Sequence, residues 1–263
     1  KNFLIEKGFY EVINFPFVNE DSKNAIVLDN PLDSNKKHLR LGLKDSLISN
    51  LLYNERRQKD SVKIFEFSNI YSQSDYLSGT KKIGIIASGR VGKNHEDFSK
   101  KINDSYLNET LKPLSSQMKF EKISRSTLNS KLKSEILYTE IDLLEISKKL
   151  NDFYIETNNS RLFNKYEPIS SFPLAVRDIS FSLRDLSNSE KLQNLILNYE
   201  NDIIKEVYIF DFYHNKVEEE LKIGFRFTFQ SVRKTLEDNE VETVIQNIIN
   251  EAFKIKSVSV PGL

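Results

Sequence analysis

The sequence predicts an α+β protein made of two successive domains, each built on an antiparallel sheet. Segments that alternate apolar and polar residues, as half-buried strands do, are interspersed with segments whose apolar residues recur every three or four positions, as in amphipathic helices. The densest strand pattern lies near the C-terminus, in the neighbouring segments Ile204–Asn215 and Glu220–Ser231. A length of 263 residues is enough for two domains that each bury a core.

The first domain, expected over residues 1–158, mixes strands and helices. Its clearest helix is His38–Arg57, because leucines and isoleucines form an apolar stripe along it. A short N-terminal helix is expected to end at Gly8, and Pro16 interrupts the strand that follows. The expected strands are Tyr10–Val18, Ala25–Leu28, Ser61–Tyr71, Lys81–Ser88, Lys119–Ser124 and Glu135–Leu143, and the other expected helices are Phe98–Leu114 and Leu143–Leu150.

The second domain, expected over residues 159–263, has a regular order of elements. We place the boundary near Asn159, in a polar stretch before Pro168. Two elements precede the strands Ile204–Asn215 and Glu220–Ser231: a strand at Val176–Leu183 and a helix that begins with a capping box at Ser187–Glu190. Two follow them: a helix capped at Thr235–Asp238 and a last strand at Lys256–Val260. The order β-α-β-β-α-β predicts a ferredoxin-like sheet with two helices on one face and the other face free.

Asp211 and Tyr213 end one face of the strand Ile204–Asn215. Uninterrupted alternation places Val207 and Ile209 on the same face, so an acid and a phenol finish an otherwise apolar row. On an open sheet, a tyrosine can stack on an unstacked base, and a carboxylate can accept the N1–H and N2–H₂ donors of guanine. The residues alone also fit, and favour, a structural interpretation in which Tyr213 is a strand-end core aromatic and Asp211 opens the turn.

The composition excludes several classes of protein. Lys and Arg together number 38, as do Asp and Glu, so no overall positive field indicates a nucleic-acid binder, and any RNA contact must be local. There are no cysteines, which excludes disulfides and thiol catalysis and fits a cytoplasmic protein. No apolar run is long enough to span a membrane. Because the sequence begins at Lys1 without an initiator Met, we expect it to be a fragment of a longer protein.

No catalytic or metal-binding motif stands out. His38, His95 and His214 are far apart in sequence, none lies in a metal-binding or triad-like setting, and surface or loop positions are expected for them. The glycine pair in Gly89–Lys93 lacks the hydroxyl and the spacing of a P-loop, so a loop bend is favoured over phosphate binding. We therefore expect no catalytic residues and no metal site in this chain.

Four stretches of the sequence resemble one family. They are Phe172–Leu183 (FPLAVRDISFSL), Ile209–Asn215 (IFDFYHN), Phe225–Val241 (FRFTFQSVRKTLEDNEV) and Leu28–Tyr71, which begins LDNPLDSNKKHLRLGLKDSL. The first three resemble the ferredoxin-fold anticodon-binding domain at the C-terminus of the phenylalanyl-tRNA synthetase β subunit. The fourth is similar to the module of that subunit related to class II synthetase cores. The resemblance covers nearly the whole chain and is weakest between Ser115 and Ser134.

The resemblance implies a role within a larger ligase, an aminoacyl-tRNA synthetase. In the family, the α subunit holds the active site, whereas the core module of the β subunit is catalytically silent and packs against α. The Gly-x-Gly-x-Gly-x-x-Arg signature of active class II cores is missing from residues 1–160, as expected for a module without catalytic activity. We accordingly expect an α2β2 heterotetramer that binds phenylalanine tRNA, with ATP and magnesium bound elsewhere in the full enzyme. The alternative is a non-catalytic scaffold that assembles the oligomer without touching RNA.

The resemblance also assigns candidate RNA-binding residues. The FD-x-Y motif gives Asp211 and Tyr213 the role of reading the anticodon, whose first base is a guanine in phenylalanine tRNA. Arg177, of the RD pair, and Arg226 are weaker candidates, as is Lys222, which stands near a position where the family often has a small hydroxyl residue. Residues 161–263 hold 13 Lys and Arg against 16 Asp and Glu, a net charge of −3, which predicts weak RNA binding by this domain in isolation.

Overall fold

The chain divides into two units, which are described separately. A computed structural model describes residues 1–19, 24–33, 35–73, 79–115, 118–128, 130–147, 168–217 and 219–261. Unit 1 comprises Lys1–Arg90 with Lys101–Arg161, and unit 2 comprises Val91–Lys100 with Leu162–Leu263. The boundary predicted near Asn159 lies outside the described residues. The sequence did not predict that Val91–Lys100 groups with unit 2.

Unit 1 is built on a five-stranded sheet with the order β1-β4-β5-β7-β6, in which only β1 runs parallel to its neighbour. A separate pair, β2 and β3, is antiparallel. The strands are β1 (Tyr10–Glu11), β2 (Phe17–Val18), β3 (His38–Leu39), β4 (Ser61–Ile70), β5 (Thr80–Gly89), β6 (Glu121–Ile123) and β7 (Ile136–Asp142). The predicted α+β class is confirmed, and the two long strands of this half lie within one or two residues of their predicted bounds.

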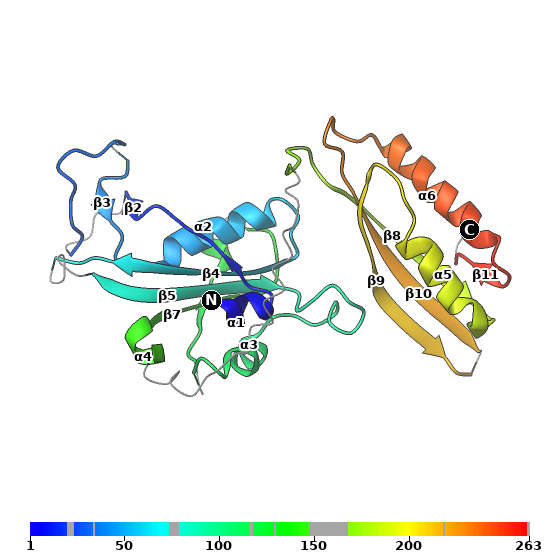
Figure 1. Cartoon of the computed structure of the whole chain (residues 1–263), viewed down its shortest axis with the longest axis horizontal. Coiled ribbons are helices and arrows are strands. Elements are labelled where there is room, and N and C mark those ends of the chain that lie inside the picture. The colour runs from blue at the N-terminus through cyan, green and yellow to red at the C-terminus, as the bar shows by residue number, and fades with distance from the viewer. Residues whose placement is uncertain are drawn as a thin grey trace. The chain divides into compact units, whose positions relative to one another are not determined.

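Helices cover both faces of this sheet (Figure 1). They are α1 (Asn2–Glu6), α2 (Lys44–Glu55), α3 (Asp104–Leu111) and α4 (Leu143–Ser147), with a 3₁₀ turn η1 at Arg125–Thr127. Leu43, Leu47 and Leu51 of the α2 stripe are fully buried against Ile64 of β4 and Ile86 of β5. The leucine stripe that the sequence singled out is therefore core.

The predicted helix at His38–Arg57 was six residues too long at its start. His38 and Leu39 form β3 against Phe17 and Val18, and the helix begins only at Lys44. The carboxylate of Glu140 accepts the Leu43 backbone N–H at 2.8 Å and satisfies a donor at the start of α2. Burial raises the pKa of Glu140, but hydrogen bonds from Leu43, Tyr138 and Lys82 outweigh it and leave the pKa below its ordinary value.

Two further predictions in unit 1 need correction. The helix predicted from Phe98 begins at Asp104, because the Asn103 side chain accepts the Tyr106 N–H at 2.9 Å and so caps the helix there. The strand predicted at Ala25–Leu28 is reduced to a single bridge from Val27 to His38.

Unit 2 has the predicted β-α-β-β-α-β order. Its sheet has the order β11-β8-β10-β9 with all pairs antiparallel, and α5 and α6 lie together on one face (Figure 1). The elements are β8 (Ala175–Leu183), a 3₁₀ turn η3 (Leu186–Asn188), α5 (Ser189–Leu197), β9 (Ile204–Asn215), β10 (Glu220–Phe229), α6 (Asp238–Phe253) and β11 (Val258–Ser259). The ferredoxin-like fold is confirmed.

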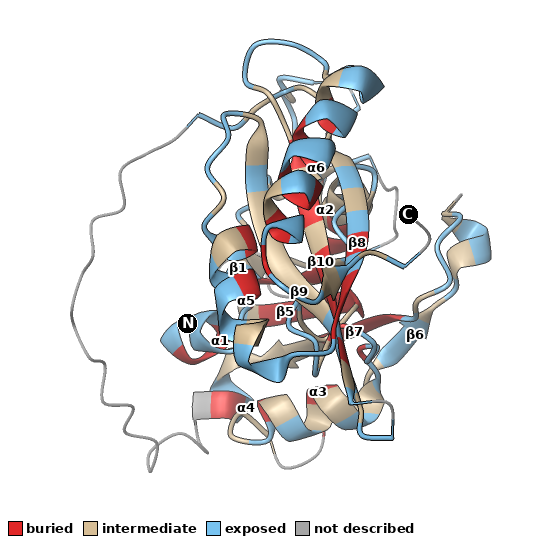
Figure 2. Ribbon diagram, turned by 90° about the vertical axis from the view of Figure 1, so that its right-hand side faces the viewer, coloured by how far each residue is buried: buried red, intermediate tan, exposed pale blue. Residues whose placement is uncertain are grey.

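The core of unit 2 lies between the sheet and the two helices. Phe225, Phe227 and Phe229 of β10 are fully buried there, together with Leu192 of α5 and Ile248 of α6. Along α6, buried and exposed residues alternate as an amphipathic helix requires (Figure 2). The opposite face of β10 carries Lys222, Gly224, Arg226 and Thr228.

The helix starts in unit 2 differ partly from prediction. At α6, Glu237 and Glu240 form a capping box within the predicted region. The capping box predicted at Ser187–Glu190 is not the arrangement before α5. Instead, the Asp185 carboxylate accepts the Ser187 N–H at 3.1 Å and the Ser187 hydroxyl at 2.6 Å. Hydrogen bonds from Ser187 hold the pKa of Asp185 below its ordinary value.

Within the part of the chain that the structure describes, none of the helices combines the length and apolar character needed to cross a membrane.

Candidate nucleic-acid interface

A bulge in β9 sets the positions of Asp211 and Tyr213. On β10, Gly224 pairs with Asp211 and the next residue, Phe225, pairs with Ile209, so Phe210 is an extra residue without a partner of its own. An inserted residue of this kind shifts the side chains that follow it to the other face of the sheet. The predicted single row of Val207, Ile209, Asp211 and Tyr213 is therefore wrong.

The shift separates an apolar half of β9 from a polar half. Val207 and Ile209 pack against the core. Asp211 and Tyr213 lie opposite Gly224 and Lys222, on the face away from α5 and α6. Tyr213 is 57% exposed and Asp211 is also exposed. No described residue forms a hydrogen bond or ion pair with the Asp211 carboxylate, so both side chains are available to a ligand.

Gly224 makes room for this arrangement. A Cβ at that position would lie 3.0 Å from the Asp211 Cβ and 3.0 Å from ring atoms of Phe210. A side chain at this point of β10 would therefore press on the bulge itself.

Gly224→Ala is expected to destabilise unit 2 by about 1–2 kcal/mol, because overpacking outweighs the small gain from a stiffer unfolded chain. Urea unfolding followed by circular dichroism measures the change. Lys222→Ala, on the same face, is the control and should change the stability by less than about 1 kcal/mol. Equal stability of Gly224→Ala and the wild type would mean that the bulge tolerates a side chain.

Arg226 does not form part of a free basic surface. Its guanidinium binds Asp178, directly opposite on β8, through two hydrogen bonds of 2.7 and 2.6 Å. It also lies 4.7 Å from the ring centre of Phe98 and 5.5 Å from that of Phe210. The hydrogen bond to Asp178 raises the pKa of Arg226 further. The guanidinium of Arg226, a predicted site residue, is thus bound by other side chains of the protein.

The two other predicted cations also have protein partners. Arg177 forms an ion pair of 2.7 Å with Asp238 at the start of α6, and Lys222 lies 3.2 Å from Glu220. Lys222 is exposed and is paired with Tyr213 across the strands, so it belongs to the same surface. Arg177, two residues after the start of β8, pairs with Phe227 and so lies apart from this surface. The structure thus brings together Asp211, Tyr213 and Lys222.

The segment Val91–Lys100 covers part of this sheet face. Phe98 is only 8% exposed, and its ring centre lies 5.3 Å from that of Phe210 and 6.3 Å from that of Tyr208. Lys93 binds both carboxylate oxygens of Glu206 at 2.7 Å. The predicted free face is therefore covered where β9 begins and open where Asp211 and Tyr213 lie.

No pattern in the sequence predicted that this segment packs on the sheet. Phe98 fitted the apolar stripe of a helix, and His95 was expected to be a surface residue. Gly89, with φ of +100°, ends β5 and confirms the predicted bend.

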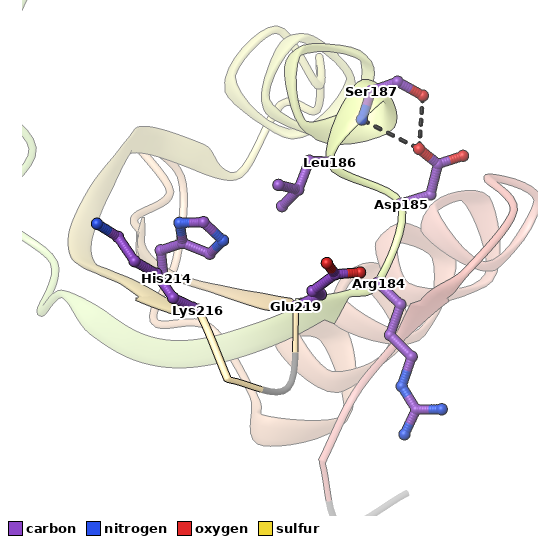
Figure 3. A pocket seen from close by; sticks show the side chains of 7 residues that line it. All are labelled: Arg184, Asp185, Leu186, Ser187, His214, Lys216 and Glu219. Atoms are coloured by element: carbon purple, nitrogen blue, oxygen red, sulfur yellow. Dashed lines mark hydrogen bonds between the residues drawn. The ribbon is translucent and has the colours of Figure 1, made fainter.

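A hollow of about 500 Å³ lies at the end of the sheet where β9 turns into β10 (Figure 3). Its lining includes His214 near the end of β9, Lys216 and Glu219 from the turn, and Leu186 and Asp185 before α5. Figure 3 shows that the Asp185 carboxylate is engaged with Ser187. With acids and bases mixed in its lining, the hollow favours neither anions nor cations. The described residues contain no group of three or more His, Cys, Asp or Glu side chains that could hold a metal ion.

Comparison with known proteins gives matches to both units. A family model described as a ferredoxin-fold anticodon binding domain matches residues 170–259, and one described as the phenylalanyl tRNA synthetase beta chain CLM domain matches residues 1–142. Curated relatives named phenylalanine–tRNA ligase beta subunit include those of Vibrio parahaemolyticus (25% identity; 95% of this chain, 36% of the relative), Legionella pneumophila (26%; 93% and 35%) and Buchnera aphidicola (26%; 94% and 35%). The chain thus spans about a third of the length of these relatives.

Proposed function

This chain belongs to the phenylalanyl-tRNA synthetase beta-chain family, and from that premise we propose that it acts as the C-terminal part of a phenylalanine–tRNA ligase β subunit. Unit 2 binds the anticodon region of phenylalanine tRNA, and unit 1 packs against the subunit that carries the active site. The observation that carries the proposal is the β9 bulge, which turns an exposed carboxylate and an exposed phenol onto the sheet face away from the helices.

The chemistry of this pair suits a guanine. The Tyr213 ring provides a stacking surface for an unstacked base, and such stacking contributes roughly 1–3 kcal/mol per base. The uncommitted Asp211 carboxylate accepts hydrogen bonds from the N1–H and the N2 amino group, which guanine alone presents together on its Watson–Crick edge. Lys222, beside Tyr213, supplies a positive charge for the adjacent phosphate.

In this proposal the chain itself performs no bond chemistry. It orients tRNA within an α2β2 enzyme of the cytoplasm, in which the α subunit forms the active site and ATP and magnesium bind outside this chain. Two of the buried polar side chains of unit 1, Arg40 and Glu66, bind each other and so stabilise the fold.

Asp211→Asn is expected to abolish preference for guanine at the first anticodon position. We compare anticodon stem-loop RNAs with guanine or inosine there, because inosine lacks only the N2 amino group. The assembled wild-type enzyme should bind the guanine RNA about tenfold or more tightly, as expected for a hydrogen bond to a charged group, and Asp211→Asn should bind both alike. Tyr213→Ala should weaken the binding of both RNAs by about tenfold.

Asp202→Asn, a matched removal of one exposed negative charge just before β9, is the control and should retain the preference. Unchanged RNA binding by both Asp211→Asn and Tyr213→Ala, with assembly lost instead, would support the alternative of a scaffold without RNA contact.

An apolar strip in unit 1 supports the proposed contact with the partner subunit. Ile13, Phe15 and Phe17 alternate along an extended segment and are 92%, 76% and 37% exposed. The residue between the first two, Asn14, points the other way and is held by Glu66, with hydrogen bonds of 3.2 and 2.8 Å. An anchored segment with a bare apolar edge is typical of an interface.

Ile13→Ser combined with Phe15→Ser is expected to reduce affinity for the α subunit by about thirtyfold or more, as for hot-spot residues. Co-purification of the two subunits and sedimentation measure assembly. Val217→Ser, which removes an equally exposed apolar side chain from unit 2, is the control and should assemble normally. Normal assembly of the double variant would exclude the strip as the contact surface.

A further inference from the structure

Unit 1 contains a hollow of about 470 Å³ on the face of its sheet that points away from α2. The floor of the hollow is formed by Phe67 of β4 and Ile83 of β5, which are paired directly across the two strands. The next residue, Gly84, faces α2, because a Cβ there would lie 3.0 Å from the Leu43 Cβ. Side chains alternate along a strand, so Ile83 points to the other face, and the sheet separates the hollow from the core beneath α2.

The helices on this face are too short to fill the hollow. Both α1 and α4 have five residues, little more than one turn, so each covers only a small part of the sheet. Phe67 is consequently only half-buried, whereas Phe65, two residues before it on the same face, is fully buried. The apolar side chains around the floor come from these helices and from the turn after α3: Phe3, Leu4, Leu114, Leu143 and Ile146.

Two lysines and no acidic residue complete the lining. The Nζ of Lys1 lies 5.6 Å from the ring centre of Phe67, and the carboxylate of Glu11 offsets its charge. Lys81 precedes Ile83 by two residues on β5, so it lies on the same face, and it is exposed. No described residue forms a hydrogen bond or ion pair with the Lys81 ammonium group. The hollow thus combines apolar walls with one uncommitted positive charge.

This combination is typical of a small-molecule site. Ligand pockets have volumes of about 300–1,000 Å³ and mostly apolar walls, with a few polar groups that orient the ligand. An ammonium group forms its strongest hydrogen bonds with anions such as carboxylates, and each apolar group that enters the hollow gains free energy by leaving water. The hollow at the end of the unit 2 sheet lacks this selectivity, because acids and bases are mixed in its lining.

We propose that the hollow of unit 1 binds a small amphipathic carboxylate, with its apolar body against Phe67 and Ile83 and its carboxylate on Lys81. The inference goes beyond the proposed function, since it requires neither RNA nor a partner subunit. A cation of the same shape is disfavoured because both lysines repel it, and a neutral molecule of the same shape lacks the ion pair with Lys81.

Titration calorimetry of the full 263-residue chain with octanoate tests the proposal. Octanoate should bind, and octan-1-ol, which has the same tail without the charge, should bind about tenfold or more weakly, as expected for loss of a hydrogen bond to a charged group. Octylammonium should not bind detectably. Methyl resonances of Ile83 and Ile146 should shift when octanoate is added, which places the ligand in the hollow.

Three variants separate the charge from the apolar walls. Lys81→Met keeps the apolar stem and should lower octanoate affinity by about tenfold or more, to that of octan-1-ol, whereas Lys81→Arg should bind close to the wild type. Leu114→Trp puts a larger side chain into the hollow and should abolish the binding of both probes. Lys59→Met, which removes an exposed lysine outside the hollow, is the matched control and should leave the affinity unchanged.

Several outcomes would overturn the inference. These are no binding of octanoate, equal binding of octanoate and octylammonium, or octanoate binding that Lys81→Met leaves unchanged. Circular dichroism shows whether Leu114→Trp is folded, and Lys81→Met, which changes only an exposed side chain, decides the test if it is not. The proposed function is tested separately through Asp211 and Tyr213, so loss of this inference leaves it standing.

Discussion

Glu66→Gln is expected to destabilise unit 1 by about 3–5 kcal/mol, because it leaves the guanidinium of Arg40 buried without a counter-charge. The two side chains are 3% and 2% exposed, with Arg40 Nη2 2.7 Å from Glu66 Oε1 and Nη1 3.3 Å from Oε2. Gln keeps the volume of Glu, so the loss reports charge and hydrogen bonding and not a cavity. Urea unfolding, with hydrogen exchange of β4 and β5 amides, measures it.

Two comparisons test this explanation. Arg40→Met combined with Glu66→Leu removes both charges and should be more stable than Glu66→Gln alone, because no unpaired charge remains. Lys44→Ala breaks the exposed ion pair with Glu121 and should cost less than about 1 kcal/mol. If the double variant were less stable than the single one, lost packing and not an unpaired charge would explain the effect.

The ion pair of Arg40 and Glu66 also affects the proposed interface with the α subunit. Glu66 holds Asn14, whose neighbours Ile13 and Phe15 form the apolar strip. Loosening Asn14 in Glu66→Gln should therefore weaken assembly with the α subunit even at temperatures where unit 1 remains folded.

The sequence predicted the elements of unit 2 well because their patterns are long and local. The bounds of β9 agree with prediction, and the six buried residues of α6 follow the three-and-four spacing. Such periodicity needs no knowledge of the rest of the chain.

The sequence could not reveal the bulge, although it decides which way Asp211 points. Ile209, Phe210 and Phe212 are all apolar, so both faces of β9 look alike around the inserted residue. Only pairing with β10 shows that Phe210 has no partner of its own. The motif predicts Asp211 and Tyr213 as the candidate pair, and their role in binding RNA stays a prediction, but the face predicted for them was wrong.

Long-range contacts explain the other differences. The leucine spacing of α2 continues through Leu41 and Leu43, and nothing local reveals that His38 pairs with Val18 instead. Likewise, the ion pair of Arg226 with Asp178 depends on the register of β8 and β10, which are far apart in sequence. Arg226 therefore resembled a free RNA contact until the sheet was known.

Phe227→Ala is expected to destabilise unit 2 by about 3–5 kcal/mol, the usual cost of removing a fully buried phenylalanine. Phe227 has no exposed surface, and its ring stacks on that of Phe229 with centres 6.2 Å apart. The cavity would lie at the centre of β10, between β8 and β9, where α5 and α6 cannot close it without moving. Urea unfolding and hydrogen exchange of β8 and β10 amides measure the loss.

Further variants in β10 separate effects on the stability of unit 2 from effects on RNA binding. Phe227→Leu keeps most of the volume and should cost less than about 1.5 kcal/mol, and Thr228→Ala, on the opposite face, about 1 kcal/mol or less. Because Asp211 and Tyr213 are positioned only by the pairing of β9 with β10, Phe227→Ala should lose RNA binding together with structure as temperature rises. The guanine preference of the molecules still folded should be unchanged. If fully folded Phe227→Ala lost the preference for guanine, the core, and not the bulge alone, would set the geometry of Asp211 and Tyr213.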